Sequence, residues 1–173
     1  RLKQWSEQLA QRTAPYAGAD SIFVGQIEAG EIYNQSPIKC CVRGTRRWVK
    51  PGTTDEVLAE FSDFVKGFAN ETGTQIGVTW EVQADAFSVA ETDVSVAAFQ
   101  LAYQAVTGEA LPFGGKPFVD DGNRYAALAG VPVLTHGPHA RGAHTTEEWV
   151  PVDELVRVAQ VYALMAVEYC MGD

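Results

Sequence analysis

All three histidines of this sequence fall in one short loop, so imidazole chemistry can be built only there. His136, His139 and His144 lie in a stretch rich in Gly and Pro, which follows the apolar run 131–134 and precedes a helical pattern starting near Val152. A neutral imidazole can serve as a metal ligand. In α/β proteins, ligands commonly bind where a strand ends in such a loop. We therefore expect the chemistry of the chain to involve this loop.

His144 is the histidine with the most suggestive neighbour, because Glu148 follows it four residues later. A metal-bound imidazole often has a carboxylate close by that fixes its orientation. One ligand does not make a metal site, however, and the spacing His-x-x-x-Glu is common in loops. The residues alone leave two interpretations open, a metal ligand and a loop histidine bonded to the backbone.

The first half of the chain has the pattern of an antiparallel sheet with two helices on one face. Apolar residues recur at helical spacing in two segments and cluster or alternate with polar ones in three others. The sequence predicts helices over 2–13 and 54–72 and strands over 21–28, 38–49 and 75–87. This order is that of a ferredoxin-like domain whose first strand is missing.

Two neighbouring arginines end the second of these strands. Side chains alternate between the faces of a strand, so Arg46 and Arg47 are expected on opposite sides of the sheet. The planar fork of donors on Arg47 suits a carboxylate. Arg46 is expected in solvent. The stripe in the following helix, formed by Val57, Phe61, Phe64 and Phe68, is expected to be core.

From Glu91 on, helical and strand patterns alternate, which favours a parallel α/β sheet. We expect helices over 94–106, 125–129 and 153–169, a strand over 131–134 and a loop over 111–121. The last helix is apolar nearly all round and is therefore expected to be buried. Because the pattern changes near residues 87–91, we place one domain over 1–88 and a second over 89–173.

Composition excludes several classes of function. The formal net charge of −9 argues against nucleic-acid binding, which needs concentrated Lys and Arg. The apolar runs are too short to span a membrane. Cys40, Cys41 and Cys170 show no Cys-x-x-Cys spacing, which fits a reducing compartment and hence the cytoplasm. The chain begins at Arg1 without an initiator Met, so we expect it to start inside a longer gene product.

Several short motifs along most of the chain resemble those of one enzyme family, in the same order. They are Asn34-x-x-Pro37, Gly44-Thr45-x-Arg47, Asp121-Gly122-Asn123-Arg124-Tyr125, Gly130-Val131-Pro132-Val133-Leu134, and Ala143-His144-Thr145 with Glu148. The family is that of the acetylornithine deacetylases, succinyl-diaminopimelate desuccinylases, aminoacylases and carboxypeptidase G-type enzymes, which are dinuclear zinc amidohydrolases.

The resemblance implies both a fold and an activity. Residues 1–88 would be a partial ferredoxin-like lid that makes a homodimer, and residues 89–173 the C-terminal part of a zinc-exopeptidase-like α/β catalytic domain. The activity would be metal-dependent hydrolysis of an amide bond in an N-acyl amino acid or a small peptide with a free carboxylate. The cofactor would be two divalent metal ions, zinc in the first place, with cobalt or manganese as alternatives.

The resemblance also implies roles for single residues. His144 would be a metal ligand, with Glu148 beside it. Arg47 would grip the carboxylate of a small-molecule substrate, and Asn34 would donate to the substrate across the dimer. Gly122 would let substrate approach the backbone closely. Each has a plainer interpretation as well: Arg47 paired with an acid, Asn34 forming a turn, and Gly122 as an ordinary loop glycine.

The departures from the family pattern limit what this chain would do alone. The family's upstream His-x-Asp, bridging Asp and Glu-Glu motifs have no counterpart before His136, and His136 and His139 match no family role. We therefore expect no catalytic residue in this chain and no activity from it in isolation. The competing hypothesis is a non-enzymatic ferredoxin-like module used for dimerisation or small-molecule binding.

Overall fold

The computed structural model describes residues 1–143 and 145–171 as a mixed α/β chain with small sheets. Contacts within the chain divide it into two compact units. Unit 1 comprises Arg1–Phe87 and Gly114–Val119, and unit 2 comprises Ser88–Phe113 and Asp120–Asp173. The segment Gly114–Val119 therefore belongs with unit 1, although the chain on both sides of it belongs with unit 2.

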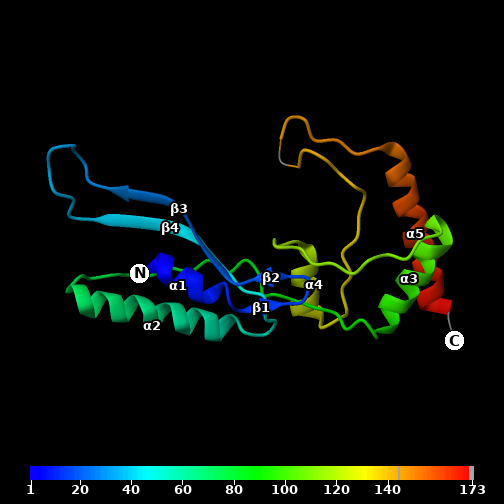
Figure 1. Cartoon of the computed structure of the whole chain (residues 1–173), viewed down its shortest axis with the longest axis horizontal. Helices are drawn as coiled ribbons and strands as arrows, with labels where there is room; N and C mark the ends of the chain where they lie inside the picture. The colour runs from blue at the N-terminus through cyan, green and yellow to red at the C-terminus, as the bar shows by residue number, and fades with distance from the viewer. Residues whose placement is uncertain (144, 172–173) are drawn as a thin grey trace. The chain divides into compact units, whose positions relative to one another are not determined.

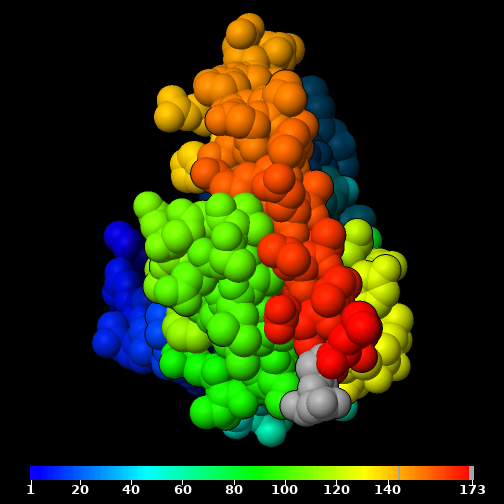
Figure 2. Space-filling model, turned by 90° about the vertical axis from the view of Figure 1, so that its right-hand side faces the viewer, coloured from blue at the N-terminus to red at the C-terminus, as the bar shows by residue number. Residues whose placement is uncertain are grey.

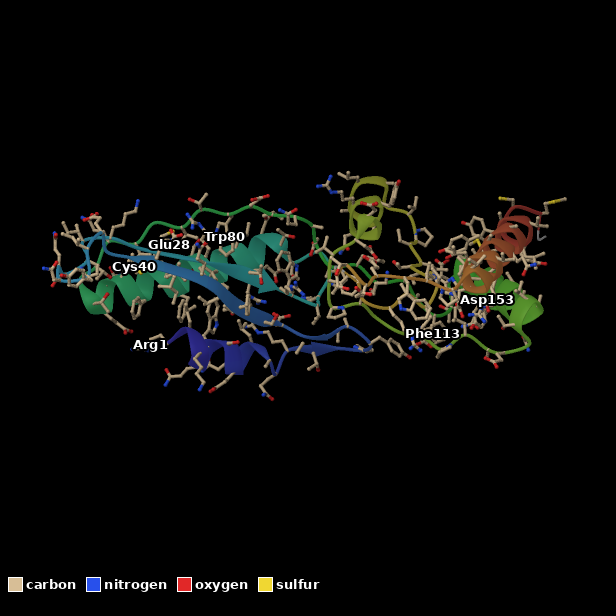
Figure 3. All side chains as sticks on the ribbon, turned by 90° about the horizontal axis from the view of Figure 1, so that it is seen from above. Arg1, Glu28, Cys40, Trp80, Phe113 and Asp153 are labelled. Carbon is tan, nitrogen blue, oxygen red and sulfur yellow. The ribbon has the colours of Figure 1, made fainter. Side chains whose placement is uncertain are left out.

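Unit 1 is built on an antiparallel hairpin, which confirms two of the predicted strands (Figure 1). Its strands are β3 (Ser21–Ala29) and β4 (Cys40–Arg47), and a smaller ribbon pairs β1 (Thr13–Ala14) with β2 (Gly18–Ala19). The register shifts between Val24 and Gln26, so Ile27 lies opposite Val42 and on the same face as Val24. Figure 3 marks Glu28 and Cys40 in the part of the hairpin farthest from its base.

Two helices lie on one side of the hairpin, as the sequence predicts (Figure 1). They are α1 (Leu2–Leu9) and α2 (Thr54–Thr72). The ring of Trp5 in α1 stacks on Phe64 of α2 with centroids 4.2 Å apart, and Phe61 lies 5.4 Å away. Gly73 ends α2 in the left-handed conformation with a φ of 66°, which a glycine adopts without strain.

The strand predicted over 75–87 is wrong, because the structure pairs none of these residues in a sheet. Side chains hold the segment instead. Trp80 meets Phe61 edge to face with centroids 4.7 Å apart. Asp85 accepts hydrogen bonds from Trp48 Nε1 at 2.6 Å and from the Gly52 amide at 2.9 Å. Any extended segment that packs on one side can show alternating apolar residues. The alternation over 75–87 therefore did not reveal whether its backbone pairs with a neighbouring strand. The ferredoxin-like arrangement is therefore not confirmed.

Unit 2 contains three helices whose ends follow from local sequence. They are α3 (Val94–Thr107), α4 (Asp121–Ala129) and α5 (Val152–Met171). Asp93 caps α3 by accepting from the Ser95 amide at 2.8 Å. The helix α4 starts four residues before its predicted start at Tyr125, because Asp120 and Asn123 form a capping box.

The helices α3 and α5 pack side by side, as the green and red atoms of Figure 2 show. Their contact buries Phe99, Ala102 and Val161, with Leu134 and Met165 packed against them. Most of the other residues of α5 are exposed, so the prediction of a buried last helix is wrong for the described residues. Only the side of α5 that meets α3 and the segment before it is covered, although its apolar residues extend all round.

The predicted strand over 131–134 is also unpaired, so the described residues contain no parallel sheet. Pro132 and Leu134 face the α3–α5 pair, while the side chain of Val131 is 48% exposed. None of the described helices is long and apolar enough to cross a lipid bilayer.

Candidate functional site

Arg47 lies at the base of the hairpin, at the last position of β4. Its backbone pairs with Ser21, and its exposed side chain donates from Nη1 to the carbonyl oxygen of Pro117 at 2.5 Å. A guanidinium carries five N–H donors, so this bond uses a small part of its capacity. Arg47 therefore presents a cation at the surface of unit 1 with a direction set by the segment Gly114–Val119.

Arg46 lies on the opposite face from Arg47, as predicted, but the prediction that it is solvated is wrong. Its side chain is only 2% exposed, because α1 and α2 lie on that side of the hairpin. Nη2 donates to Asp20 Oδ2 at 2.7 Å and lies 3.9 Å from Glu60 Oε2. Nη1 donates to the carbonyl oxygen of Arg47. A buried guanidinium thus bonds directly to the peptide group that carries the candidate substrate anchor.

A second arginine completes this network. Arg12 holds Glu60 with two hydrogen bonds of 2.8 and 2.5 Å. The hydrogen bond from Arg12 lowers the pKa of the Glu60 carboxyl, against an opposing effect of burial, and the same bond raises the pKa of Arg12. The lowered pKa keeps Glu60 charged at neutral pH, so it offers a negative partner close to the buried Arg46. The sequence signal for this network was that Arg46 shares the face of β4 with the apolar Val42; the helices cover the Arg46 end of this face and leave Val42 exposed.

Asn34 lies at the other end of the same hairpin from Arg47. It is exposed in the connection between β3 and β4, beside Tyr33, whose side chain is 99% exposed. Arg47 pairs at the base of the hairpin, while this connection forms its tip (Figure 1). One copy of the chain therefore does not bring Asn34 and Arg47 together.

Gly122 lies in the first turn of α4 rather than in a loop. It is buried, and its amide donates to Asp120 Oδ1 at 2.9 Å as part of the helix cap. The amide of Gly122 is thus already used by the protein. The absence of a side chain is the feature that a close ligand could use.

The predicted metal ligand His144 lies outside the described residues. An isolated β-bridge between Arg141 and Trp149 closes its loop. The guanidinium carbon of Arg141 also lies over the Trp149 ring, 5.6 Å from the ring centroid. Gly142 enters the turn with a φ of 68°, and a Cβ there would lie 2.6 Å from the carbonyl oxygen of Glu147. The turn just before position 144 therefore demands a glycine.

His136 is packed among aromatic rings. Its ring centroid lies 5.1 Å from that of Phe99, 5.8 Å from Tyr103 and 6.0 Å from Tyr162, all at steep angles. The hydroxyl of Tyr162 donates to the His136 carbonyl oxygen. Nδ1 is buried and has no hydrogen-bond partner among the described residues. Burial, followed by the nearby charge of Arg157, lowers the pKa of His136, which favours the neutral ring.

The described residues do not form a metal centre by themselves. No group of three His, Cys, Asp or Glu side chains converges in the part of the chain that the structure describes. His139 is exposed, and its amide donates to Glu154 Oε2 at 3.4 Å. Two or more donors from elsewhere would be needed to hold a metal ion beside this loop.

Comparisons with known proteins give a family and a fold. Residues 7–168 match the model of the family described as peptidase family M20/M25/M40. None of the curated protein sequences matches the chain. The structure is similar to the crystal structure of an M20 family metallo-carboxypeptidase from Sulfolobus solfataricus, with a TM-score of 0.67 and 12% sequence identity. The similarity covers 98% of this chain and 42% of that chain.

Proposed function

The chain belongs to peptidase family M20/M25/M40, and from this premise we propose that it works as part of a metal-dependent hydrolase. The proposed reaction is cleavage of an amide bond in an N-acyl amino acid or a small peptide with a free carboxylate. The observation that carries the proposal is the family match over residues 7–168, which includes the exposed Arg47. The chain spans 42% of the solved relative, so the activity proposed is that of the whole protein.

Each unit has a proposed part in this enzyme. Residues 1–88, with the hairpin of unit 1, act as a lid and dimerisation domain, and residues 89–173 contribute the C-terminal part of the catalytic domain. Two exposed apolar side chains on one face of the hairpin support an interface there: Ile27 is 65% exposed, and Val42, opposite it, is 50% exposed. Side chains of this kind at such exposure commonly mark a protein–protein contact when they gather.

We assign the substrate carboxylate to Arg47. Its guanidinium is exposed, and its partner Pro117 offers a neutral carbonyl rather than a competing carboxylate. A carboxylate can therefore take two further N–H donors in a bidentate pair. Asn34 is proposed to reach the site of a partner subunit, because it lies at the opposite end of the hairpin from Arg47. Gly122 is proposed to line the substrate path.

His144 is proposed as one metal ligand, with the remaining ligands outside this chain. The metal is proposed to be a pair of divalent ions, zinc first and cobalt or manganese as alternatives. The test is the metal content of the complete protein and its hydrolysis of N-acetyl amino acids and dipeptides. His144→Ala is expected to lower both more than tenfold, since even outer partners of a metal ligand change affinity by roughly 10–100-fold.

His139→Ala is the matched control, because His139 lies in the same loop and is exposed. It is expected to leave metal content and rate unchanged. The products decide between a deacylase, which releases an acyl acid, and a carboxypeptidase, which releases a C-terminal amino acid. A complete protein that binds no metal and hydrolyses neither substrate would instead be the non-enzymatic module.

A further inference from the structure

One buried guanidinium links the core of unit 1 to the peptide group of Arg47. Arg46 donates from Nη1 to the carbonyl oxygen of Arg47 and from Nη2 to Asp20 Oδ2 at 2.7 Å. The side chains of Arg46 and Asp20 are 2% and 6% exposed. Charge-assisted bonds shielded from water are short and strongly directional, so the two groups hold each other in one geometry.

Asp20 is itself held on both sides. Its Oδ1 accepts from the Val49 amide at 3.0 Å, and its own amide donates to the Arg12 carbonyl oxygen at 3.0 Å. The chain from Arg46 to Val49 is thus attached to Asp20 at two points, one before and one after Arg47. This leaves the backbone of Arg47 little freedom at the end of a strand, where pairing alone would let it fray.

Stability alone does not explain a charged pair at this place. Burying two charges costs desolvation, and an apolar pair of similar volume is often as stable or more so. The Nε of Arg46 is also buried without a hydrogen-bond partner among the described residues, which adds to that cost. An apolar side chain could fill the same space, but it could not donate to the Arg47 carbonyl oxygen.

We infer that Arg46 is a positioning residue for Arg47: it holds the Arg47 peptide group so that the guanidinium on the opposite face points to the substrate carboxylate. The side chain of Arg47 is held at its other end by Pro117, so both ends have a defined place. A guanidinium that is already held in place loses less conformational entropy when it binds a carboxylate than a mobile one does. This inference rests on the proposed role of Arg47 in the hydrolase.

The test uses the complete, metal-loaded enzyme and two forms of one substrate, with a free carboxylate and with that carboxylate amidated. Arg46→Met is expected to raise KM for the free carboxylate about tenfold with kcat nearly unchanged, because the interaction lost is one of ground-state binding. KM for the amidated form is expected to stay the same. Arg46→Met leaves the buried Asp20 without its charged partner. The double variant Asp20→Asn with Arg46→Met is therefore measured beside it.

The double variant separates positioning from folding. Asn can still accept from the Val49 amide, and no buried charge remains, so its thermal unfolding is expected to be close to that of the parent. The KM defect for the free carboxylate is expected to persist. Arg12→Gln is the matched control: it removes another cation from the same network and destabilises the fold, but it does not touch the Arg47 peptide. Its ratio of KM values for the two substrates is expected to equal that of the parent.

Two results would overturn the inference, and they are distinguishable. If Arg47→Gln raises KM for the free carboxylate but the double variant does not, Arg46 has a structural role only. If Arg47→Gln itself leaves both KM values unchanged, the carboxylate assignment in the proposed function is wrong, and the positioning role is wrong with it.

Discussion

Two ionisable side chains in this protein are shielded from water to different degrees, and they have different neighbours. The guanidinium of Arg46 is buried, and the carboxylates of Asp20 and Glu60 face it. His136 is half-buried among Phe99, Tyr103 and Tyr162, and this burial lowers its pKa. Both positions were misread or left without a role from sequence, since burial of a polar side chain depends on partners that are distant in the chain.

The half-buried ring of His136 makes stability depend on pH. Its pKa is lowered in the folded state by burial and by Arg157 of α5, with Glu154 acting in the opposite direction. The folded state therefore binds fewer protons than the unfolded one below the ordinary histidine pKa of about 6.5. The free energy of unfolding is expected to fall as the pH drops from about 7 to 5.

His136→Phe keeps the aromatic packing and removes the proton, so its unfolding free energy should lose this slope. The measurement is denaturant unfolding at several pH values. The control is His139→Phe, because His139 is exposed and should leave the slope unchanged. An equal slope in His136→Phe and in the parent would show that His136 titrates normally in the folded protein.

At the scale of elements, β3, β4, α2 and α3 were predictable, because each carries both a periodic apolar pattern and a local stop signal. Gly73 and Gly108, for example, end α2 and α3 in the left-handed conformation. The segments 75–87 and 131–134 were not predictable as unpaired, because alternation reports burial on one side and not the presence of a neighbouring strand. The motif in the sequence identified Arg47. The network of Arg46, Asp20 and Glu60 behind it could be recognised only in the three-dimensional structure.

Gly44 is the position where the hairpin depends most directly on one residue. A Cβ at Gly44 would lie 2.1 Å from the carbonyl oxygen of Phe23 across the strand pair. Gly44→Ala is therefore expected to destabilise unit 1 by about 1–3 kcal/mol, the usual cost of overpacking. It should also lower affinity for a carboxylate substrate, since Arg47 follows on the same strand.

The matched comparison is Gly67→Ala in α2, where an added Cβ meets nothing within 4 Å. That change is expected to stabilise the protein by roughly 0.5–1 kcal/mol, because glycine weakens a helix interior. Thermal unfolding of both variants checks the prediction. A Gly44→Ala protein as stable as the parent would mean that the strands separate at this point without cost.

For the whole molecule, the proposed homodimer gives the clearest test. Ile27 and Val42 lie opposite each other in the hairpin, on one face, and are 65% and 50% exposed. Replacing both with Lys is expected to weaken self-association by tenfold or more, as about 1.4 kcal/mol corresponds to a factor of ten. Analytical ultracentrifugation over a range of concentrations measures this.

Gln26→Lys serves as the control, because Gln26 lies on the other face, paired with Arg43. It should leave the mass distribution unchanged. A protein that is monomeric without any substitution would remove the dimer proposal, and equal association in all three proteins would place the interface away from this face.

The route of the chain limits how the protein can be taken apart. It passes from one unit to the other between Phe87 and Ser88, returns at Gly114 and leaves again after Val119. A piece excised at residue 87 would lack the carbonyl of Pro117 that receives the Arg47 guanidinium. It would also lack Gly115, which fits against the backbone of Tyr16 where a Cβ would come within 2.4 Å. An isolated lid that keeps these contacts therefore has to include the segment Gly114–Val119, which follows α3 in the sequence.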